Sequence, residues 1–215
     1  MTEEQQQELI DLCVELEERA CLDRVQALLA SGEDPMAIVE ACESGMHQVG
    51  ERYAEGEYFI SGLIMAGEIF REVLALVQPS METLRRGQAR GRILLGTAQG
   101  DIHDIGKSIV SVALRSHGFT VDDIGVNVAP QAFAERALEL RPDIVGLSGL
   151  LTTSYDSMRE TVEILKAEVS PRYRPLPVII GGGTLSEDVR RYVGADYCVR
   201  DALAGVRICE RISAS

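Results

Sequence analysis

The stretch Gly100–Gly106, written GDIHDIG, holds one of only three histidines in the chain, placed between two aspartates. The apolar run RILLGTA precedes it and the helical pattern KSIVSVALRSHG follows it, so we expect a loop joining a buried strand to a helix. Asp101 could accept a hydrogen bond from His103 Nδ1 if the loop turns back. Nε2 would then keep its lone pair, which suits a metal ligand or a general base.

The small number of histidines limits the kinds of metal site that the chain could form. A catalytic metal site made of protein groups alone usually has about three ligands. The other histidines, His47 and His117, lie in the first half of the chain and near the end of a predicted helix, so neither is placed to converge on His103. If His103 binds a metal, a cofactor must supply the other ligands, and a macrocycle with equatorial nitrogens fits. The competing interpretation is an ordinary hydrogen-bonded loop histidine.

Three further loops gather groups that could bind a ligand. Ser148–Ser154 (SGLLTTS) offers four hydroxyls, and capping of the following helix needs only one of them. Gly181–Thr184 (GGGT) is either a tight turn or a place where a large planar or nucleotide-like group approaches the backbone. Arg200–Ala202 follows the last predicted strand.

Two periodicities divide the chain. From Thr2 to about Gln78 apolar residues recur at spacings of three and four, with breaks at 31–32 and 55–57, which predicts a bundle of about four helices. The segment Gln78–Gly91 collects Pro, Gly and Arg and is predicted to be a linker. We therefore expect a helical domain over residues 1–88 and an α/β domain over residues 89–215.

The second half alternates short apolar runs with amphipathic helical stretches. The runs are RILLGTA, FTVDDIGV, DIVGLSGL, PVIIGGG and DYCVRD. This alternation predicts right-handed βαβ units and a doubly wound parallel sheet of about five strands, an α/β fold of the flavodoxin-like (Rossmann-like) class. Such sheets bind ligands beyond the carboxyl ends of their strands, where the strand order reverses. All four loops should therefore lie at one edge of the sheet.

The composition indicates which partners and which cellular compartment to expect. The net charge of −13 disfavours nucleic acid, because binding phosphates requires clustered Lys and Arg. No apolar run approaches the length of a membrane span and the acidic start MTEEQQQELIDL is unlike a signal peptide, so the cytoplasm is expected. The cysteines are scattered and lack a CxxC spacing, which signals neither a disulfide framework nor a zinc site. Most are expected in the core of a reduced protein: Cys13, Cys21, Cys42, Cys198 and Cys209.

Together the motifs resemble the cobalamin-binding module of corrinoid proteins and of cobalamin-dependent methionine synthase. The family pattern DxHxxG, SxL and GG is matched in order and spacing by Asp101–Gly106, Ser148–Leu150 and Gly181-Gly182. Gly45–Ile60 (GMHQVGERYAEGEYFI) is similar to the family's helical cap segment, so the resemblance covers nearly the whole chain. It implies cobalamin or a related corrinoid as the cofactor.

The resemblance also implies roles for single residues. His103 would displace the cofactor's own base and ligate cobalt from below, Asp101 would orient the imidazole, and Ser154 would hydrogen-bond onward from Asp101. The remaining implied contacts are Ser148, Leu150, Gly181 and Gly182 around the displaced nucleotide tail, then Gly100, Asp104, Gly106, Thr152 and Ala202, and finally Tyr53, Ile60 and Leu63 as shields of the cobalt and its methyl group. Without the resemblance, the last three would be interpreted as core residues.

The implied function is that of a methyl carrier and not of a complete enzyme, since 215 residues leave no room for a substrate barrel, a tetrahydrofolate domain or an activation domain. Co(I), as in cob(I)alamin, would accept a methyl group from a substrate-specific methyltransferase. Methyl-Co(III), as in methylcob(III)alamin, would pass it to a second methyltransferase with a pterin or thiol acceptor. The donor could be methanol, a methylamine, a betaine or an aryl methyl ether, and a reductive activator protein is a further implied partner.

A cobalamin-dependent sensor or regulator is the alternative function of the same module. Such proteins typically add a DNA-binding unit, and the acidic first half shows no basic recognition helix. A mutase subunit fits less well, because Tyr53 and Ile60 suit a small upper ligand. A receiver-like domain without a corrin would explain the fold but not the three motifs together.

Overall fold

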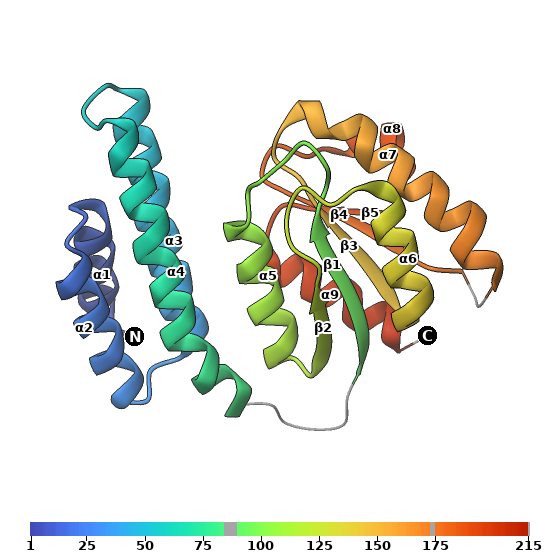
Figure 1. Cartoon of the computed structure of the whole chain (residues 1–215). Coiled ribbons are helices and arrows are strands. Elements are labelled where there is room, and N and C mark those ends of the chain that lie inside the picture. Colours follow the sequence, from blue (N-terminus) through green and yellow to red (C-terminus); the bar gives the residue numbers. More distant parts are fainter. Residues whose placement is uncertain (84–89, 173–174, 215) are drawn as a thin grey trace. The chain divides into compact units, whose positions relative to one another are not determined.

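The computed structural model describes residues 1–83, 90–172 and 175–214. The chain divides into two compact units, Met1–Leu84 (unit 1) and Arg85–Ser215 (unit 2), which are coloured blue to teal and green to red in Figure 1. The predicted boundary between residues 88 and 89 lies outside the described residues.

Unit 1 is the predicted bundle of four helices. They are α1 (Glu3–Val14), α2 (Glu18–Ala30), α3 (Pro35–Ala54) and α4 (Ile60–Thr83). Helix α3 packs against both α1 and α4, and α2 packs against α4. The break before α3 forms as expected, because the Asp34 carboxylate accepts a hydrogen bond from Met36 N while Pro35 occupies the first turn.

The predicted linker begins too early in the chain. Helix α4 continues through Pro79 to Thr83 instead of ending near Gln78. Val73, Val77 and Met81 are almost fully buried at a spacing of four, so the apolar face of the helix extends past the proline. Burial of this face outweighs the local helix-breaking tendency of Pro79.

Unit 2 alternates strands and helices along the chain. Its elements are β1 (Gly91–Thr97), α5 (Ile105–Ser116), β2 (Phe119–Asp123), α6 (Pro130–Leu140), β3 (Ile144–Ser148), α7 (Tyr155–Ile164), β4 (Val178–Gly181), α8 (Glu187–Val193), β5 (Tyr197–Val199) and α9 (Ala202–Ser213). Short helical turns at Thr152–Ser154, Leu165–Val169 and Ser170–Arg172 flank α7.

The five strands form one parallel sheet with the order β2-β1-β3-β4-β5. Helix α5 packs against α9, and α6 packs against α7, which also contacts α8 (Figure 1). The central strands are buried, as the continuous apolar runs predicted. The flavodoxin-like fold class is therefore confirmed.

The strand order places the reversal point between β1 and β3. The chain goes from β1 to β2 on one side and then returns to β3 on the other side of β1. In such sheets the loops that follow these two strands face each other across a crevice. GDIHDIG follows β1 and SGLLTTS begins at the last residue of β3, so both predicted loops reach this point.

Candidate functional site

The carboxylate of Asp101 joins the loops that follow β1 and β3. Its Oδ2 accepts hydrogen bonds from the backbone N–H groups of Leu150 (2.6 Å) and Leu151 (2.9 Å). Its Oδ1 accepts one from His103 N (3.0 Å) and faces His103 Nδ1 at 2.6 Å. These four contacts use about all the acceptor sites that a carboxylate offers.

Asp101 is held as an anion in a fully buried position. Burial alone would raise the pKa of this carboxyl, but hydrogen bonds from Leu150, His103 and Leu151 outweigh the loss of water and lower its pKa from 3.8 to about 2. An ionised carboxylate only accepts hydrogen bonds, so the proton between Asp101 and His103 resides on Nδ1.

His103 is thereby fixed in one tautomer at the edge of the sheet. Nδ1 is engaged by Asp101, and the His103 carbonyl accepts a hydrogen bond from the buried Thr97 hydroxyl (3.0 Å). The imidazole nevertheless remains 51% exposed. Nε2 is the ring nitrogen left with a lone pair, the arrangement expected of a metal-ligating histidine with a carboxylate partner. His117, by contrast, is the C-cap residue of α5, and its Nδ1 forms a hydrogen bond with Ala113 O.

Asn127 supports this loop and was missed by the sequence analysis. Its side-chain oxygen accepts a hydrogen bond from Gly100 N (2.9 Å), and its own N–H donates to Asp101 O (2.9 Å). The residue has a φ of 52°, in the left-handed region that asparagine tolerates better than most residues. The available signal was an asparagine two residues after Gly125, in the turn that follows a strand.

The predicted hydrogen bond between Ser154 and Asp101 does not form. The buried Ser154 hydroxyl donates to Leu151 O (2.7 Å), and Leu151 N in turn donates to Asp101. The physical reason is that the acceptor sites of Asp101 are already occupied. Nor does a hydroxyl cap α7, because Ser154 stands at the N-cap position without a capping bond from its side chain.

Gly182 is required by the protein's own backbone. A Cβ atom at this position would lie 2.0 Å from Gly149 O, so the loops after β3 and β4 touch through their main chains. Gly149 is similarly confined, since a Cβ there would meet Met158 Sδ at 3.0 Å. A Cβ at Gly183 would meet no atom within 4 Å. Within the glycine run, Gly182 is therefore closely packed, whereas Gly183 borders open space.

The other predicted contacts of unit 2 also follow strand ends or begin helices. Thr152 is exposed and Leu150 is half-buried. Thr184 Oγ1 donates to Leu150 O (2.7 Å), which ties the loop after β4 to the loop after β3. The remaining positions are Gly100 in the loop after β1, Asp104 at the N-cap of α5, Gly106 in its first turn, Ser148 and Gly181 at the ends of β3 and β4, and Ala202 at the start of α9.

Large apolar side chains are exposed just beyond the carboxyl ends of four strands. We use the name apolar rim for Ile102 (71% exposed), Val126 (39%), Leu151 (40%) and Leu203 (37%), which follow β1, β2, β3 and β5. Apolar residues clustered at one exposed edge mark a binding surface more often than isolated ones do. An imidazole with a free nitrogen among such residues suits a large, partly apolar cofactor whose metal accepts a nitrogen ligand.

The predicted upper-face residues lie in unit 1, where two of them are not core residues. Tyr53 near the end of α3 is 42% exposed, Ile60 at the start of α4 is 64% exposed, and Leu63 is half-buried. Phe59 and Ile64 beside them are 82% and 62% exposed. The interpretation of Tyr53 and Ile60 as core residues is therefore wrong, because both expose apolar surface at the junction of α3 and α4.

Comparisons with known proteins show similarity to B12-binding domains and to corrinoid proteins. Two family models, both described as a B12 binding domain, match residues 5–78 and 91–205. Dimethylamine corrinoid protein 2 from Methanosarcina acetivorans is 36% identical over 95% of this chain and 94% of its own length. Trimethylamine corrinoid protein 2 from Methanosarcina mazei is 33% identical over 92% of each chain. The solved structure of the Methanosarcina barkeri monomethylamine corrinoid protein has the same fold, with a TM-score of 0.85 over 95% of this chain and 96% of that one at 24% identity.

The chain belongs to the B12-binding corrinoid proteins, the family of methyl carriers that work in methyltransferase systems, and its cofactor is a corrinoid. Methyltransferases are the partners of such proteins, as in the solved methanol:cobalamin methyltransferase complex MtaBC from Methanosarcina barkeri. Across the described ranges 1–83, 90–172 and 175–214, no helix has the length and hydropathy to cross a membrane.

Proposed function

We propose that this chain carries methyl groups taken from a methylamine, with His103 as the ligand that the protein offers to the corrinoid cobalt. The observation that carries the proposal is the Asp101–His103 pair at the reversal point of the sheet. Asp101 occupies Nδ1 at 2.6 Å and leaves Nε2 available on a half-exposed imidazole. A corrinoid bound there supplies the cobalt that takes up and gives up the methyl group.

The residues around His103 fit a corrinoid on physical grounds. The apolar rim offers Ile102, Val126, Leu151 and Leu203 to the apolar periphery of a macrocycle. Open space at Gly183 and the exposed hydroxyl of Thr152 suit a polar tail beside the loops after β3 and β4. We assign the tail contacts to Ser148, Leu150, Gly181 and Gly182, and further contacts to Gly100, Asp104, Gly106, Thr152, Ser154 and Ala202.

Unit 1 would cover the methyl-bearing side of the cofactor. The basis is the exposed apolar surface at Tyr53 and Ile60, together with Leu63 one turn further along α4. A polar surface would be a poor cover, because water near the metal would compete with the transferred group. The assignment of these residues rests on this surface and on the family pattern.

The Asp101–His103 pair would also bind and release a proton. Since the pKa of Asp101 is about 2, its carboxylate stays charged at neutral pH, and any additional proton is taken by the imidazole. His103 Nε2 would hold a proton only while it holds no metal, because both need the same lone pair. The Asp101 carboxylate would stabilise the imidazolium in the protonated state.

The partners follow from the same proposal. A methylamine-specific methyltransferase would load the carrier, because the similar proteins are named for dimethylamine and trimethylamine. A second methyltransferase would unload it to a pterin or thiol, and a reductive activator would restore the reduced cofactor. We also infer a cytoplasmic location, where the free cysteines stay reduced.

Spectroscopy and a transfer assay test the proposal. Protein loaded with cobalamin should show the spectrum of a histidine-ligated corrinoid without its own base. His103→Ala should lose that spectrum, while the matched His117→Ala should keep it. With mono-, di- or trimethylamine and a corresponding methyltransferase, loaded protein should gain a methyl group. An unchanged spectrum in His103→Ala, or cofactor-dependent DNA binding without methyl uptake, would overturn the proposal.

A further inference from the structure

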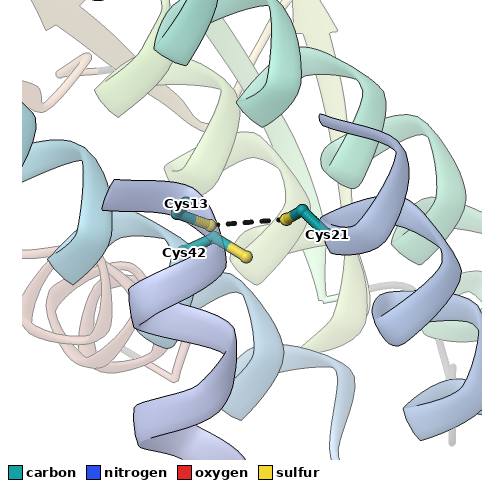
Figure 2. A group of neighbouring side chains, drawn as sticks. All are labelled: Cys13, Cys21 and Cys42. Atoms are coloured by element: carbon teal, nitrogen blue, oxygen red, sulfur yellow. Dashed lines mark hydrogen bonds between the residues drawn. The ribbon is translucent and has the colours of Figure 1, made fainter. Parts of the chain in front are cut away.

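Three cysteines from three different helices meet in the interior of unit 1. Cys13 lies on α1, Cys21 on α2 and Cys42 on α3. Figure 2 shows their sulfur atoms gathered between the helices, with Cys13 Sγ and Cys21 Sγ 3.4 Å apart. All three sulfurs lie within 4.8 Å of one another. The sequence spacing had signalled no such group.

The position of Cys13 depends on a glycine of the neighbouring helix. A Cβ atom at Gly45, three residues after Cys42 on α3, would lie 2.5 Å from Cys13 Cβ and 3.1 Å from Ile10 O. Any larger residue at position 45 would force α1 away from α3. The missing side chain therefore lets Cys13 reach the same face of α3 as Cys42.

The sulfur distances match those around a single bound metal ion. Metal–thiolate bonds of about 2.3 Å arranged in a plane place the sulfurs about 4.0 Å apart. The Cys13–Cys21 sulfur distance is 3.4 Å and the other two sulfur distances are at most 4.8 Å, so all three are compatible with that value. Shifts of roughly half an ångström or less would bring all three sulfurs to bonding distance.

Burial limits the number of ligands to three. The exposed fractions of Cys13, Cys21 and Cys42 are 4%, 0% and 0%, so water has little access to complete a coordination shell. Among the residues that the structure describes, no fourth His, Cys, Asp or Glu joins the group. Zinc in structural sites almost always has four ligands. Soft thiolates alone select soft ions, of which Cu⁺ accepts three-fold coordination.

We propose that Cys13, Cys21 and Cys42 form a closed, three-coordinate thiolate site for a soft monovalent metal ion of the Cu⁺ type. This site is separate from His103, since it lies inside unit 1. Thiols that bind the ion release their protons to the solvent, and no electron is transferred. An ion held by three helices would also stabilise the bundle against unfolding.

The test uses protein loaded with cob(II)alamin, so that His103 is engaged, under reducing and oxygen-free conditions. Cu⁺ is supplied from a chromophoric chelator of known affinity. We expect one Cu⁺ per chain, a thiolate-to-copper charge-transfer band, and X-ray absorption that reports three sulfur neighbours. Cys13→Ala and Cys42→Ala should each weaken binding by at least about tenfold.

Cys209→Ala is the matched control, because Cys209 is equally buried but belongs to unit 2. It should bind Cu⁺ as tightly as the unchanged protein. The X-ray absorption of the unchanged protein requires no variant to fold, so it decides the coordination by itself. Nitrogen or oxygen neighbours, equal Cu⁺ affinity in Cys42→Ala, or tighter binding of Zn²⁺ than of Cu⁺ would overturn the proposal.

Discussion

Replacing Asp101 by asparagine removes the charge of this side chain and leaves its shape almost unchanged. The amide oxygen can still accept from Leu150 N and Leu151 N, which belong to the neighbouring loop. The amide NH₂ then faces His103, whose backbone N–H loses its acceptor. To accept a bond from the amide, Nδ1 must give up its proton, and the neutral imidazole then carries its proton on Nε2. The variant thus blocks the nitrogen that we assign to the metal.

Two independent routes give the size of the effect on stability. The lowering of the Asp101 pKa from 3.8 to about 2 corresponds to roughly 2.5 kcal/mol in favour of the charged carboxylate in the folded protein. Leaving one buried N–H group without an acceptor costs about 1–3 kcal/mol. We therefore expect Asp101→Asn to lower the free energy of unfolding by about 2–3 kcal/mol. His103→Ala should lower it by only about 1 kcal/mol, because the backbone bonds to Asp101 remain.

Urea unfolding of the cofactor-free protein measures the stability, and the absorption spectrum of the loaded protein measures histidine ligation. The loaded Asp101→Asn protein should show a smaller histidine-ligated fraction than the unchanged protein, because the tautomer with its proton on Nε2 has no lone pair there for a metal. An unfolding free energy within about 0.5 kcal/mol of the unchanged protein, together with an unchanged histidine-ligated fraction, would refute this reasoning.

Four further outcomes are expected. The stabilisation from Asp101 should be present above about pH 4 and lost as the pH falls through about 2, so the stability difference between the unchanged protein and Asp101→Asn should shrink in acid. Gly182→Ala should cost at least about 2 kcal/mol in urea unfolding because its Cβ would meet Gly149 O at 2.0 Å, whereas Gly183→Ala should be neutral. Asn127→Ala should cost about 1–2 kcal/mol through the lost bond to Gly100 N and slow histidine ligation. Ile102→Ser should leave stability unchanged but weaken corrinoid binding about fivefold in a titration, since about 1 kcal/mol of apolar burial is lost.

The fold and the location of the site could be predicted because both depend on local patterns. Helical and strand periodicities are read within a few residues, and ligand position in a parallel sheet follows from strand ends. His103 and Asp101 are two residues apart, so their contact needs only a turn. The helix across Pro79 escaped prediction because its support comes from burial of Val77 and Met81, which is a tertiary effect.

Contacts between distant segments could not be predicted in this way. Asp101 binds N–H groups about fifty residues away, and Asn127 closes the loop from a third segment. Cys13, Cys21 and Cys42 meet because of how three helices pack, and their spacing of eight and twenty-one residues has no local meaning. Almost every residue type has a backbone N–H group, so the sequence does not show which of these groups bind Asp101. That all acceptor sites of Asp101 are occupied is seen only in the folded chain.

That saturation would allow His103 to change its ligation state, as we propose, without disturbing the fold. Of the four hydrogen bonds to Asp101, three come from the backbone N–H groups of Leu150, Leu151 and His103. These bonds hold the loops after β1 and β3 together whether or not Nε2 binds a metal. Only the fourth bond, to Nδ1, involves the imidazole ring. The backbone bonds would therefore hold His103 in place while its Nε2, the ring nitrogen opposite Asp101, binds or releases the metal that we assign to it.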